Sequence, residues 1–255
     1  MSEQPVLTEI ADGILTITLN RPAARNAANK ALAEGVAAAI DELESNPELR
    51  VAILTGAGGT FCSGMDLKAF VTGELPVVEG RGFAGICEYS GKKPLIAAVE
   101  GYALAGGFEV AISCDLIVAA DDSKFGIPEV KRGLAAGAGG LAKLPKQIPS
   151  RIAKELALTG DFISAQRAYD LGLINQVVPS GTALQAAKEL AQKIAANGPL
   201  AVAASKQVVD QAQDWSSDEM FAKQGVIIQP IFTSEDAIEG ATAFAEKRAP
   251  QWKGR

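Results

Sequence analysis

The chain has 255 residues, of which 48% are hydrophobic and 21% charged, and its formal net charge is −6. This length and hydrophobic content allow a sizeable buried core and disfavour disorder, while the acidic balance disfavours nucleic-acid binding through a general basic field. The chain has no histidine, which excludes Ser-His-Asp and Cys-His catalysis and imidazole metal ligands, so proton transfer must fall to Asp, Glu, Lys, Tyr, Cys or water.

The first half of the chain is predicted to contain strands that alternate with helices. Residues 6–10 and 14–19 are apolar strands flanking an Asp-Gly turn, which predicts a β-hairpin. A helix rich in Ala and Leu is predicted over residues 29–44. Short apolar runs then predict buried strands; they are residues 51–54, 95–99 and 116–119, with helical segments between. This alternation indicates parallel βα units preceded by an antiparallel hairpin.

The second half is predicted to be mostly helical. Only residues 174–178 resemble a strand there. Helices are predicted over residues 152–158, 165–171, 183–196, 200–213 and 234–247. The sequence therefore predicts one chain-long unit, with a β/α core followed by a helical C-terminal part.

The sequence also bears on the cellular compartment. No run of about 18 apolar residues is present, so no membrane span is expected. The first residues lack a basic stretch followed by an apolar one, so no signal peptide is expected. Cys62, Cys87 and Cys114 are odd in number and far apart, which is typical of a reducing, cytoplasmic setting.

The first glycine-rich segment covers residues 55–67 and follows a predicted strand. A dinucleotide-binding fingerprint needs a third glycine at the start of the next helix, where Phe61 stands instead, and no P-loop pattern is present. Two interpretations remain open. The segment is either a surface turn or a helix start at residues 63–66, where unpaired backbone N–H groups face an anion.

The second glycine-rich segment covers residues 100–112. Ala105, Gly106 and Gly107 are small and would let another group approach the backbone closely. Glu109 then lies in the first turn of an apolar helix, where a buried carboxylate is costly unless it is paired or used. The alternative is a glutamate favourably placed near a helix N-terminus or facing solvent.

The third segment places Glu129 after Pro128 and continues to a glycine run at residues 137–140. Glu129 is either a functional carboxylate or a loop residue paired with Lys131 or Arg132. The glycine run precedes a predicted helix and offers further free N–H groups.

These three segments, with one near each end of the chain, resemble the motifs of the enoyl-CoA hydratase/isomerase (crotonase) superfamily. The likeness covers nearly the whole chain in the right order. The matching segments are residues 19–22 with 26–27 (N-R-P…N-A), 61–67 (F-x-[AS]-G-x-D-[LI]), 101–109 (G-x-A-x-G-G-G-x-E, with alanine for one glycine), 125–129, 137–140, and 244–250 with 253–255.

The resemblance implies a catalytic role for two backbone N–H groups and two glutamates. Met65 and Gly106 would form an oxyanion hole for the thioester carbonyl oxygen. Hydratases of this family carry glutamates at the positions of Glu109 and Glu129, whereas isomerases commonly keep only the later one. Glu109 would activate water and Glu129 would give a proton to the α-carbon.

The resemblance also implies an acyl-CoA thioester as substrate, with no separate cofactor and no metal. Lys247 would reach a phosphate in a neighbouring subunit, although each cation could equally be an ordinary solvated one. The other residues implied in binding coenzyme A are Ala24, Arg25, Ser63, Asp66, Leu67 and Lys68.

The implied fold is an α/β crotonase-like spiral core of ββα units. We expect the core over residues 1–195 and a helical C-terminal oligomerisation region over residues 196–255. The family typically forms homotrimers that pair into hexamers, and many members serve fatty-acid β-oxidation. No nucleic acid or membrane partner is expected.

Some residues depart from the family pattern and leave the reaction open. Residues 141–143 read Leu-Ala-Lys where Thr-Gln-Arg is frequent, and Ala136 replaces a frequent proline. The ending, residues 234–240 with 252–255, looks like the carnitine-pathway branch, the crotonobetainyl-CoA hydratases or carnitinyl-CoA dehydratases. An isomerase, a dehalogenase, a thioester hydrolase and a non-catalytic acyl-CoA-binding scaffold are the alternatives.

Overall fold

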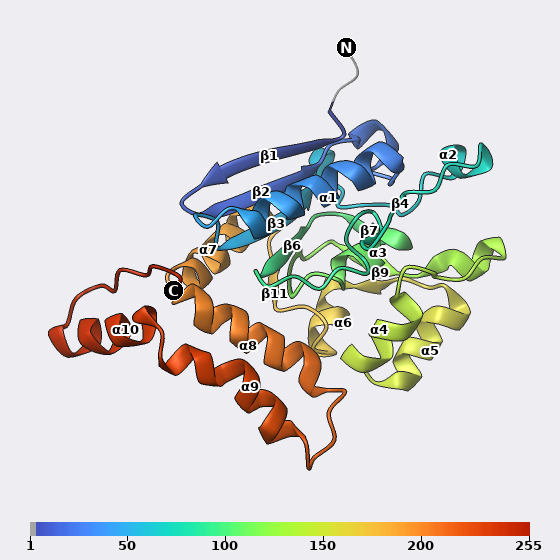
Figure 1. Cartoon of the computed structure of the whole chain (residues 1–255). Coiled ribbons are helices and arrows are strands. Elements are labelled where there is room, and N and C mark those ends of the chain that lie inside the picture. Colours follow the sequence, from blue (N-terminus) through green and yellow to red (C-terminus); the bar gives the residue numbers. More distant parts are fainter. Residues whose placement is uncertain (1–3) are drawn as a thin grey trace.

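The computed structural model describes residues 4–255 and is built around a six-stranded sheet (Figure 1). The strand order is β1-β2-β3-β6-β8-β11. β1 and β2 are antiparallel and every later pair is parallel, which confirms the predicted hairpin and βα units. The strands are β1 (Val6–Ala11), β2 (Ile14–Leu19), β3 (Val51–Gly56), β6 (Leu95–Val99), β8 (Leu116–Ala120) and β11 (Gln176–Val178).

Helices cover both faces of this sheet, because its strands are apolar on both sides. Along β3, Val51 and Ile53 belong to the cluster packed against α7 (Ala183–Ala195), while Ala52 and Leu54 belong to the larger cluster on the other face. That larger cluster includes the buried face of α1 (Lys30–Ser45). The Asn29 side chain accepts a hydrogen bond from Leu32 N and fixes the start of α1.

A smaller sheet and a short hairpin lie beside the main sheet. The smaller sheet has the order β10-β9-β7, from β10 (Ile163–Ser164), β9 (Lys124–Gly126) and β7 (Tyr102–Leu104). The hairpin pairs β4 (Val77–Val78) with β5 (Gly82–Phe83). The sequence did not predict these strands, because two or three residues are too few to show a period of two.

The remaining core helices connect these strands. The sequence predicted the helices near residues 152–158 and 165–171, and the structure confirms both as α5 and α6. The short helical elements are η1 (Pro22–Ala24), η2 (Ala57–Gly59), α2 (Leu67–Val71), α3 (Gly106–Ala111), η3 (Pro128–Arg132), α4 (Gly140–Gln147), α5 (Ser150–Thr159) and α6 (Ala165–Asp170).

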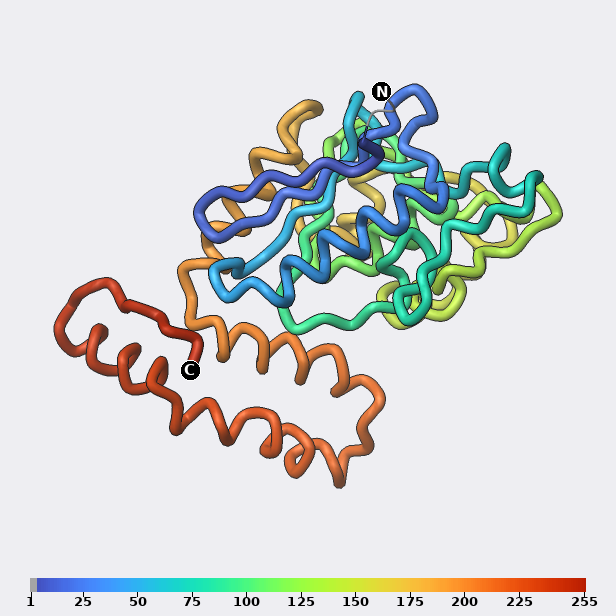
Figure 2. Tube along the Cα trace, turned by 45° about the horizontal axis from the view of Figure 1, so that its top comes forward, coloured from blue at the N-terminus to red at the C-terminus, as the bar shows by residue number. Residues whose placement is uncertain are grey.

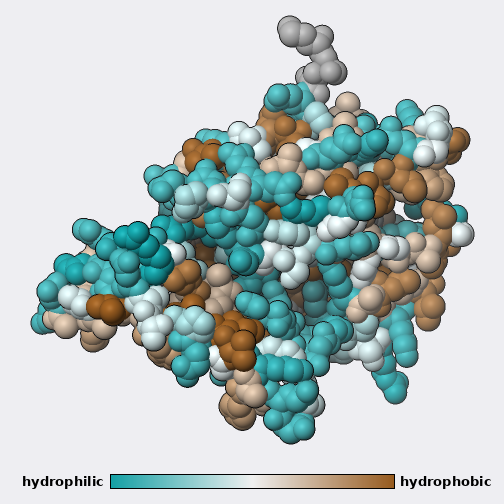
Figure 3. All heavy atoms as spheres, viewed as in Figure 1, coloured by the Kyte–Doolittle hydropathy of each residue, from teal (hydrophilic) through white to brown (hydrophobic). Residues whose placement is uncertain are grey.

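Residues 196–255 form a helical arm that extends away from the sheet (Figures 1 and 2). Its helices are α8 (Pro199–Ala212), α9 (Met220–Phe232) and α10 (Glu235–Glu246). α9 buries none of its residues, and apolar side chains gather on the surface of the arm (Figure 3). None of the helices in residues 4–255 is long and apolar enough to cross a membrane.

Candidate active site

The first two glycine-rich segments lie side by side. Cys62 N donates to Tyr102 O at 2.9 Å, and Leu104 N donates to Cys62 O at 3.0 Å. These hydrogen bonds place the backbone at Gly64 next to the start of α3. A Cβ atom on Gly64 would lie 2.8 Å from Ala105 Cβ, closer than side chains pack, so only glycine fits there.

The N–H groups of Met65 and Gly106 make no hydrogen bond among residues 4–255. Gly106 is the first residue of α3, where a helix leaves its N–H groups unpaired. Met65 is held by its neighbours, because Ala28 N donates to Gly64 O at 2.7 Å and Asp66 N donates to Ala28 O at 2.9 Å. Both predicted oxyanion donors are therefore free, on adjoining segments.

Glu109 lies in the first turn of α3 and is 2% exposed, so the prediction of a buried carboxylate is correct. Its Oε1 atom accepts hydrogen bonds from Ala138 N and Gly140 N, each at 2.8 Å. Burial raises the pKa of Glu109, while the two N–H groups and the charge of Lys143 oppose that rise. Backbone N–H groups of the third glycine-rich segment thus bind the carboxylate of Glu109, which belongs to the second segment.

Glu129 lies in the first turn of η3 and is half-buried. Its Oε2 atom is inaccessible to solvent and has no hydrogen-bond partner among the described residues. Burial raises the pKa of Glu129, and the nearby charge of Glu109 raises it further. Lys131, one of the partners left open by the sequence, instead pairs with Asp161 at 2.7 Å.

Phe83 is a site residue that the sequence did not identify. Its ring fills the space beside Gly106, with Cε1 2.5 Å from the position that a Cβ on Gly106 would take. Phe83 comes from β5, about twenty residues before α3 in the chain, and no local pattern signals this contact. The ring forms an apolar wall next to one of the two free N–H groups.

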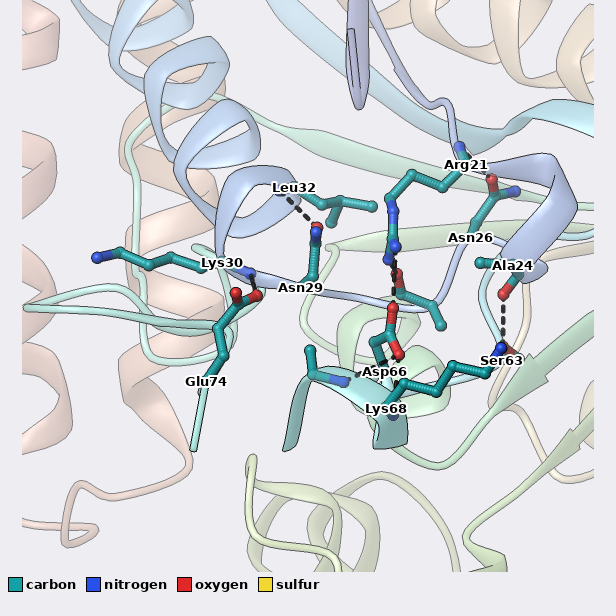
Figure 4. Close-up of polar contacts among 12 residues, drawn as sticks. Arg21, Ala24, Asn26, Asn29, Lys30, Leu32, Ser63, Asp66, Lys68 and Glu74 are labelled. Atoms are coloured by element: carbon teal, nitrogen blue, oxygen red, sulfur yellow. Dashed lines mark hydrogen bonds and ion pairs between the residues drawn. The ribbon is translucent and has the colours of Figure 1, made fainter. Parts of the chain in front are cut away.

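Asp66 is already engaged within the chain (Figure 4). Its Oδ2 atom pairs with Arg21 Nη2 at 2.9 Å, and its Oδ1 atom accepts from Lys68 N at 3.1 Å and Ala69 N at 3.4 Å. Asp66 therefore caps α2, which confirms the predicted helix start. The hydrogen bond from Arg21 lowers the pKa of Asp66.

The other residues implied in binding coenzyme A fall into two groups. Ser63 N donates to Arg25 O at 3.1 Å and Ser63 Oγ donates to Ala24 O at 3.5 Å (Figure 4), so these three residues lie together. Leu67 and Lys68 follow on the exposed surface of α2. Lys247 ends α10, which lies at the opposite side of the molecule from α2 (Figures 1 and 2). A single chain does not bring Lys247 to this group.

Known proteins resemble the chain over its full length. The profile of the family "Enoyl-CoA hydratase/isomerase" matches residues 9–255. The carnitinyl-CoA dehydratase of Salmonella typhi is 43% identical over 263 residues, covering 100% of each chain. The crystal structure of an enoyl-CoA hydratase from Mycobacterium tuberculosis H37Rv has 61% identity and a TM-score of 0.97, covering 99% of this chain and 100% of that one.

A carnitinyl-CoA hydratase from Mycobacterium avium gives a third comparison, with 44% identity, a TM-score of 0.80 and coverage of 100% of both chains. The family profile, the full-length relatives and the shared fold agree with one another. The chain therefore belongs to the enoyl-CoA hydratase/isomerase family, as an enzyme of the enoyl-CoA hydratase type with the crotonase fold.

Proposed function

We propose that the chain is a hydro-lyase that adds water to a trans-2-enoyl-CoA to give a 3-hydroxyacyl-CoA, and that it also catalyses the reverse dehydration. One observation carries this proposal. Two carboxyl groups, Glu109 and Glu129, both have a raised pKa, and the charge of Glu109 contributes to the raised pKa of Glu129; Glu109 stands on the helix that begins with Gly106, one of the two residues with a free backbone N–H group. Hydration of a conjugated thioester needs these two kinds of group.

The two N–H groups would stabilise the charge that develops on the thioester. When water attacks the β-carbon, negative charge moves to the carbonyl oxygen as an enolate. Met65 N–H and Gly106 N–H would donate to that oxygen, and each donor is worth about 2.7–4 kcal/mol in comparable sites. Because the donors belong to the backbone, they are oriented before the substrate binds.

The surroundings of the two carboxyls support different roles. Glu109 accepts two N–H hydrogen bonds, which favour its ionised form, so Glu109 would take the proton from water. Glu129 Oε2 has no donor among the described residues and faces the charge of Glu109, which favours its protonated form. Glu129 would therefore give the proton to the α-carbon.

Coenzyme A would lie along α2 and the turn before it. Arg25 and Lys68 are exposed cations beside Ser63, Ala24 and Leu67, and cations of this kind suit phosphate groups. We propose that Asp66 contributes by fixing the start of α2. Lys247 would act only from a neighbouring subunit.

We propose that residues 1–195 are the catalytic core and that residues 196–255 join subunits into homotrimers and hexamers. The boundary lies between the end of α7, which covers the sheet, and the start of α8. Exposed apolar side chains on the arm support an interface there, since water-exposed apolar surface of this kind is costly for a monomer. The three free, buried cysteines support a reducing, cytoplasmic setting.

A second candidate reaction is the hydration of crotonobetainyl-CoA, or the dehydration of carnitinyl-CoA. The full-length identity of 43% to the carnitinyl-CoA dehydratase of Salmonella typhi favours it. The chemistry would use the same four groups, and only the acyl end of the substrate would differ. An isomerase reaction on the same fold would need one glutamate only.

The test follows the ultraviolet absorbance of the conjugated enoyl thioester after the enzyme is added to crotonyl-CoA or to crotonobetainyl-CoA. The variants are Glu109→Gln and Glu129→Gln. Loss of absorbance with the parent, and almost none with either variant, would support a hydratase that uses both carboxylates. The substrate that reacts faster would show whether the enzyme prefers crotonyl-CoA or crotonobetainyl-CoA. Full activity of Glu109→Gln in shifting a double bond would instead favour the isomerase. No reaction with either thioester would contradict the proposal.

A further inference from the structure

Lys143 lies directly behind the proposed base. It belongs to α4, the helix whose first residues hold the Glu109 carboxylate. Its Nζ atom donates to Cys87 O at 2.6 Å and to Ser113 Oγ at 2.8 Å. Ser113 Oγ in turn donates to the backbone oxygen of Glu109 at 2.7 Å. One ammonium group therefore joins α4, the end of α3 and the segment after β5.

The side chain of Lys143 also packs over the loop that binds the carboxylate. A Cβ atom on Gly139 would lie 3.3 Å from Lys143 Cε, so the stem covers the residue between the two N–H donors, Ala138 and Gly140. Movement of Lys143 would disturb both donors. The position of Lys143 therefore links its charge to the geometry of the Glu109 carboxylate.

Lys143 has no carboxylate within ion-pair distance in the described part of the chain, unlike the neighbouring Lys146, which pairs with Asp214 at 2.7 Å. A partly buried ammonium is costly without a compensating charge. The charged and titratable groups around the base are Lys143, Glu129 and the thiol of Cys87. Burial raises the pKa of Cys87 to about 12, so that thiol is neutral, and the charge of Lys143 lowers the pKa of Glu109.

We propose that Lys143 is a positioning residue that holds the Glu109 carboxylate in its charged, water-activating form on the N–H groups of Ala138 and Gly140. This inference rests on the proposed role of Glu109 as the base. Lys143 does not touch the reacting atoms, and it acts through charge and through the hydrogen bonds that tie α4 to α3. The Ser113 hydroxyl and the carbonyl of Cys87 accept the hydrogen bonds that hold Lys143 in this position.

The experiment measures the pH dependence of kcat/KM for enoyl-CoA hydration in the parent, Lys143→Met and Lys143→Arg. Without the cation, the acidic limb assigned to Glu109 should move about one pH unit toward higher pH. On the acidic side of that limb, activity should fall about tenfold relative to the parent and recover as the pH rises. Lys143→Arg should keep the limb close to that of the parent. Lys146→Met, on the same helix, should leave the profile unchanged.

A second readout separates this inference from the proposed reaction. Carbon NMR of selectively labelled glutamate carboxyls titrates Glu109 directly, with Glu109→Gln to assign its signal, and needs no turnover. A higher midpoint in Lys143→Met supports the inference, even if the parent hydrates no thioester and the proposed function fails. An unchanged midpoint, or a loss of activity equal at every pH, would overturn it and leave Lys143 a purely structural residue.

Discussion

The backbone nitrogen of Gly106 lies 3.3 Å from the place that a Cβ on Gly64 would occupy. Gly64 also has a φ of +102°, in a region that L side chains rarely adopt. The two segments that carry the free N–H groups are therefore in contact through a residue that can be nothing larger than glycine.

Gly64→Ala should accordingly damage the proposed oxyanion hole. The new methyl would collide with Ala105 and displace Met65 N, so kcat should fall at least about a hundredfold, as for the loss of one donor. The strain should also lower the free energy of unfolding by about 1–3 kcal/mol. Steady-state kinetics and urea denaturation measure the two effects. Gly59 also has a positive φ, of +72°, but a Cβ there would meet nothing within 4 Å, so Gly59→Ala should cost stability without a comparable loss of kcat.

Ala105 stores backbone strain at the start of α3. Its φ is 52° and its ψ is −130°, a combination that glycine adopts far more readily. Ala105→Gly should raise the free energy of unfolding by about 1 kcal/mol, because relief of strain exceeds the added entropy of the unfolded chain. Urea denaturation measures the change. Ala103 is a nearby buried residue without a positive φ, so Ala103→Gly should be destabilising, and equal effects at both positions would contradict this account.

Glu129 should make stability depend on pH. Its pKa is raised in the folded protein, so its contribution to stability is complete below the usual value of 4.5 and is lost as the pH rises through the raised pKa. Glu129→Gln removes this pH-dependent contribution to stability. The variant should therefore gain on the parent as the pH rises from 4.5 through the raised pKa, and should keep that gain at higher pH.

Chemical denaturation of both proteins at several pH values checks this difference. Glu239→Gln is the opposite control, because hydrogen bonds from Arg248 lower the pKa of Glu239 to about 2. Glu239 stabilises the protein above its usual pKa, so its replacement should cost stability at neutral pH. A difference between Glu129→Gln and the parent that stays constant with pH would rule out the expected linkage.

The Arg21–Asp66 pair should support both stability and binding. Asp66→Ala removes the pair and the cap of α2, so it should cost about 1–2 kcal/mol at pH 7 and raise KM for the acyl-CoA, since Lys68 is then no longer held. Asp66→Asn keeps a capping oxygen and should cost less. The pKa of Asp66 is lowered, so the advantage of the parent over Asp66→Asn is complete above pH 3.8 and disappears as the pH falls through the lowered pKa. Denaturation of the parent and of Asp66→Asn at several pH values from 7 to 3 checks this. If the pair contributes nothing, the difference between their free energies of unfolding will not change with pH.

The arm should hold the oligomer together through α9. Phe221 is 77% exposed and Val226 is 78% exposed in the single chain. Replacing both with Asp should reduce the mass in solution, measured by light scattering, because charged groups disfavour an apolar interface. Lys223→Ser on the same helix is the matched control. A monomeric parent would contradict the proposed role of residues 196–255.

Periodic patterns predicted the large elements of the fold but not the short ones. The hairpin, β3, β6 and β8 were predicted because buried strands and their turns are local signals. α9 was missed, since Gly225 and Pro230 interrupt its pattern and no buried face gives it a period. The boundaries of the predicted helices shifted by one or two residues, as capping side chains decide the ends.

Some residues of the candidate site could likewise be predicted from the sequence and others could not. Glu109 was recognisable as a charge inside an apolar helix, but its two N–H partners come from a segment about thirty residues later. Phe83 carries no local signal, and Lys143 stood out only as a departure from the family pattern, because the contacts of both residues arise only when distant segments pack together. The resemblance to the family supplied the pairing of Met65 with Gly106, and the structure supplied the contacts that bring their segments together.

Gly106 and Glu109 stand three residues apart on one helix, which separates them by about 4.5 Å along its axis. Under the roles proposed for these residues, the distance between the N–H donor to the thioester carbonyl and the base that activates water would be set by the pitch of the helix. Side-chain changes around the acyl group leave that spacing untouched. Substrate preference can therefore differ among relatives while the spacing between the N–H group of Gly106 and the residue Glu109 stays the same.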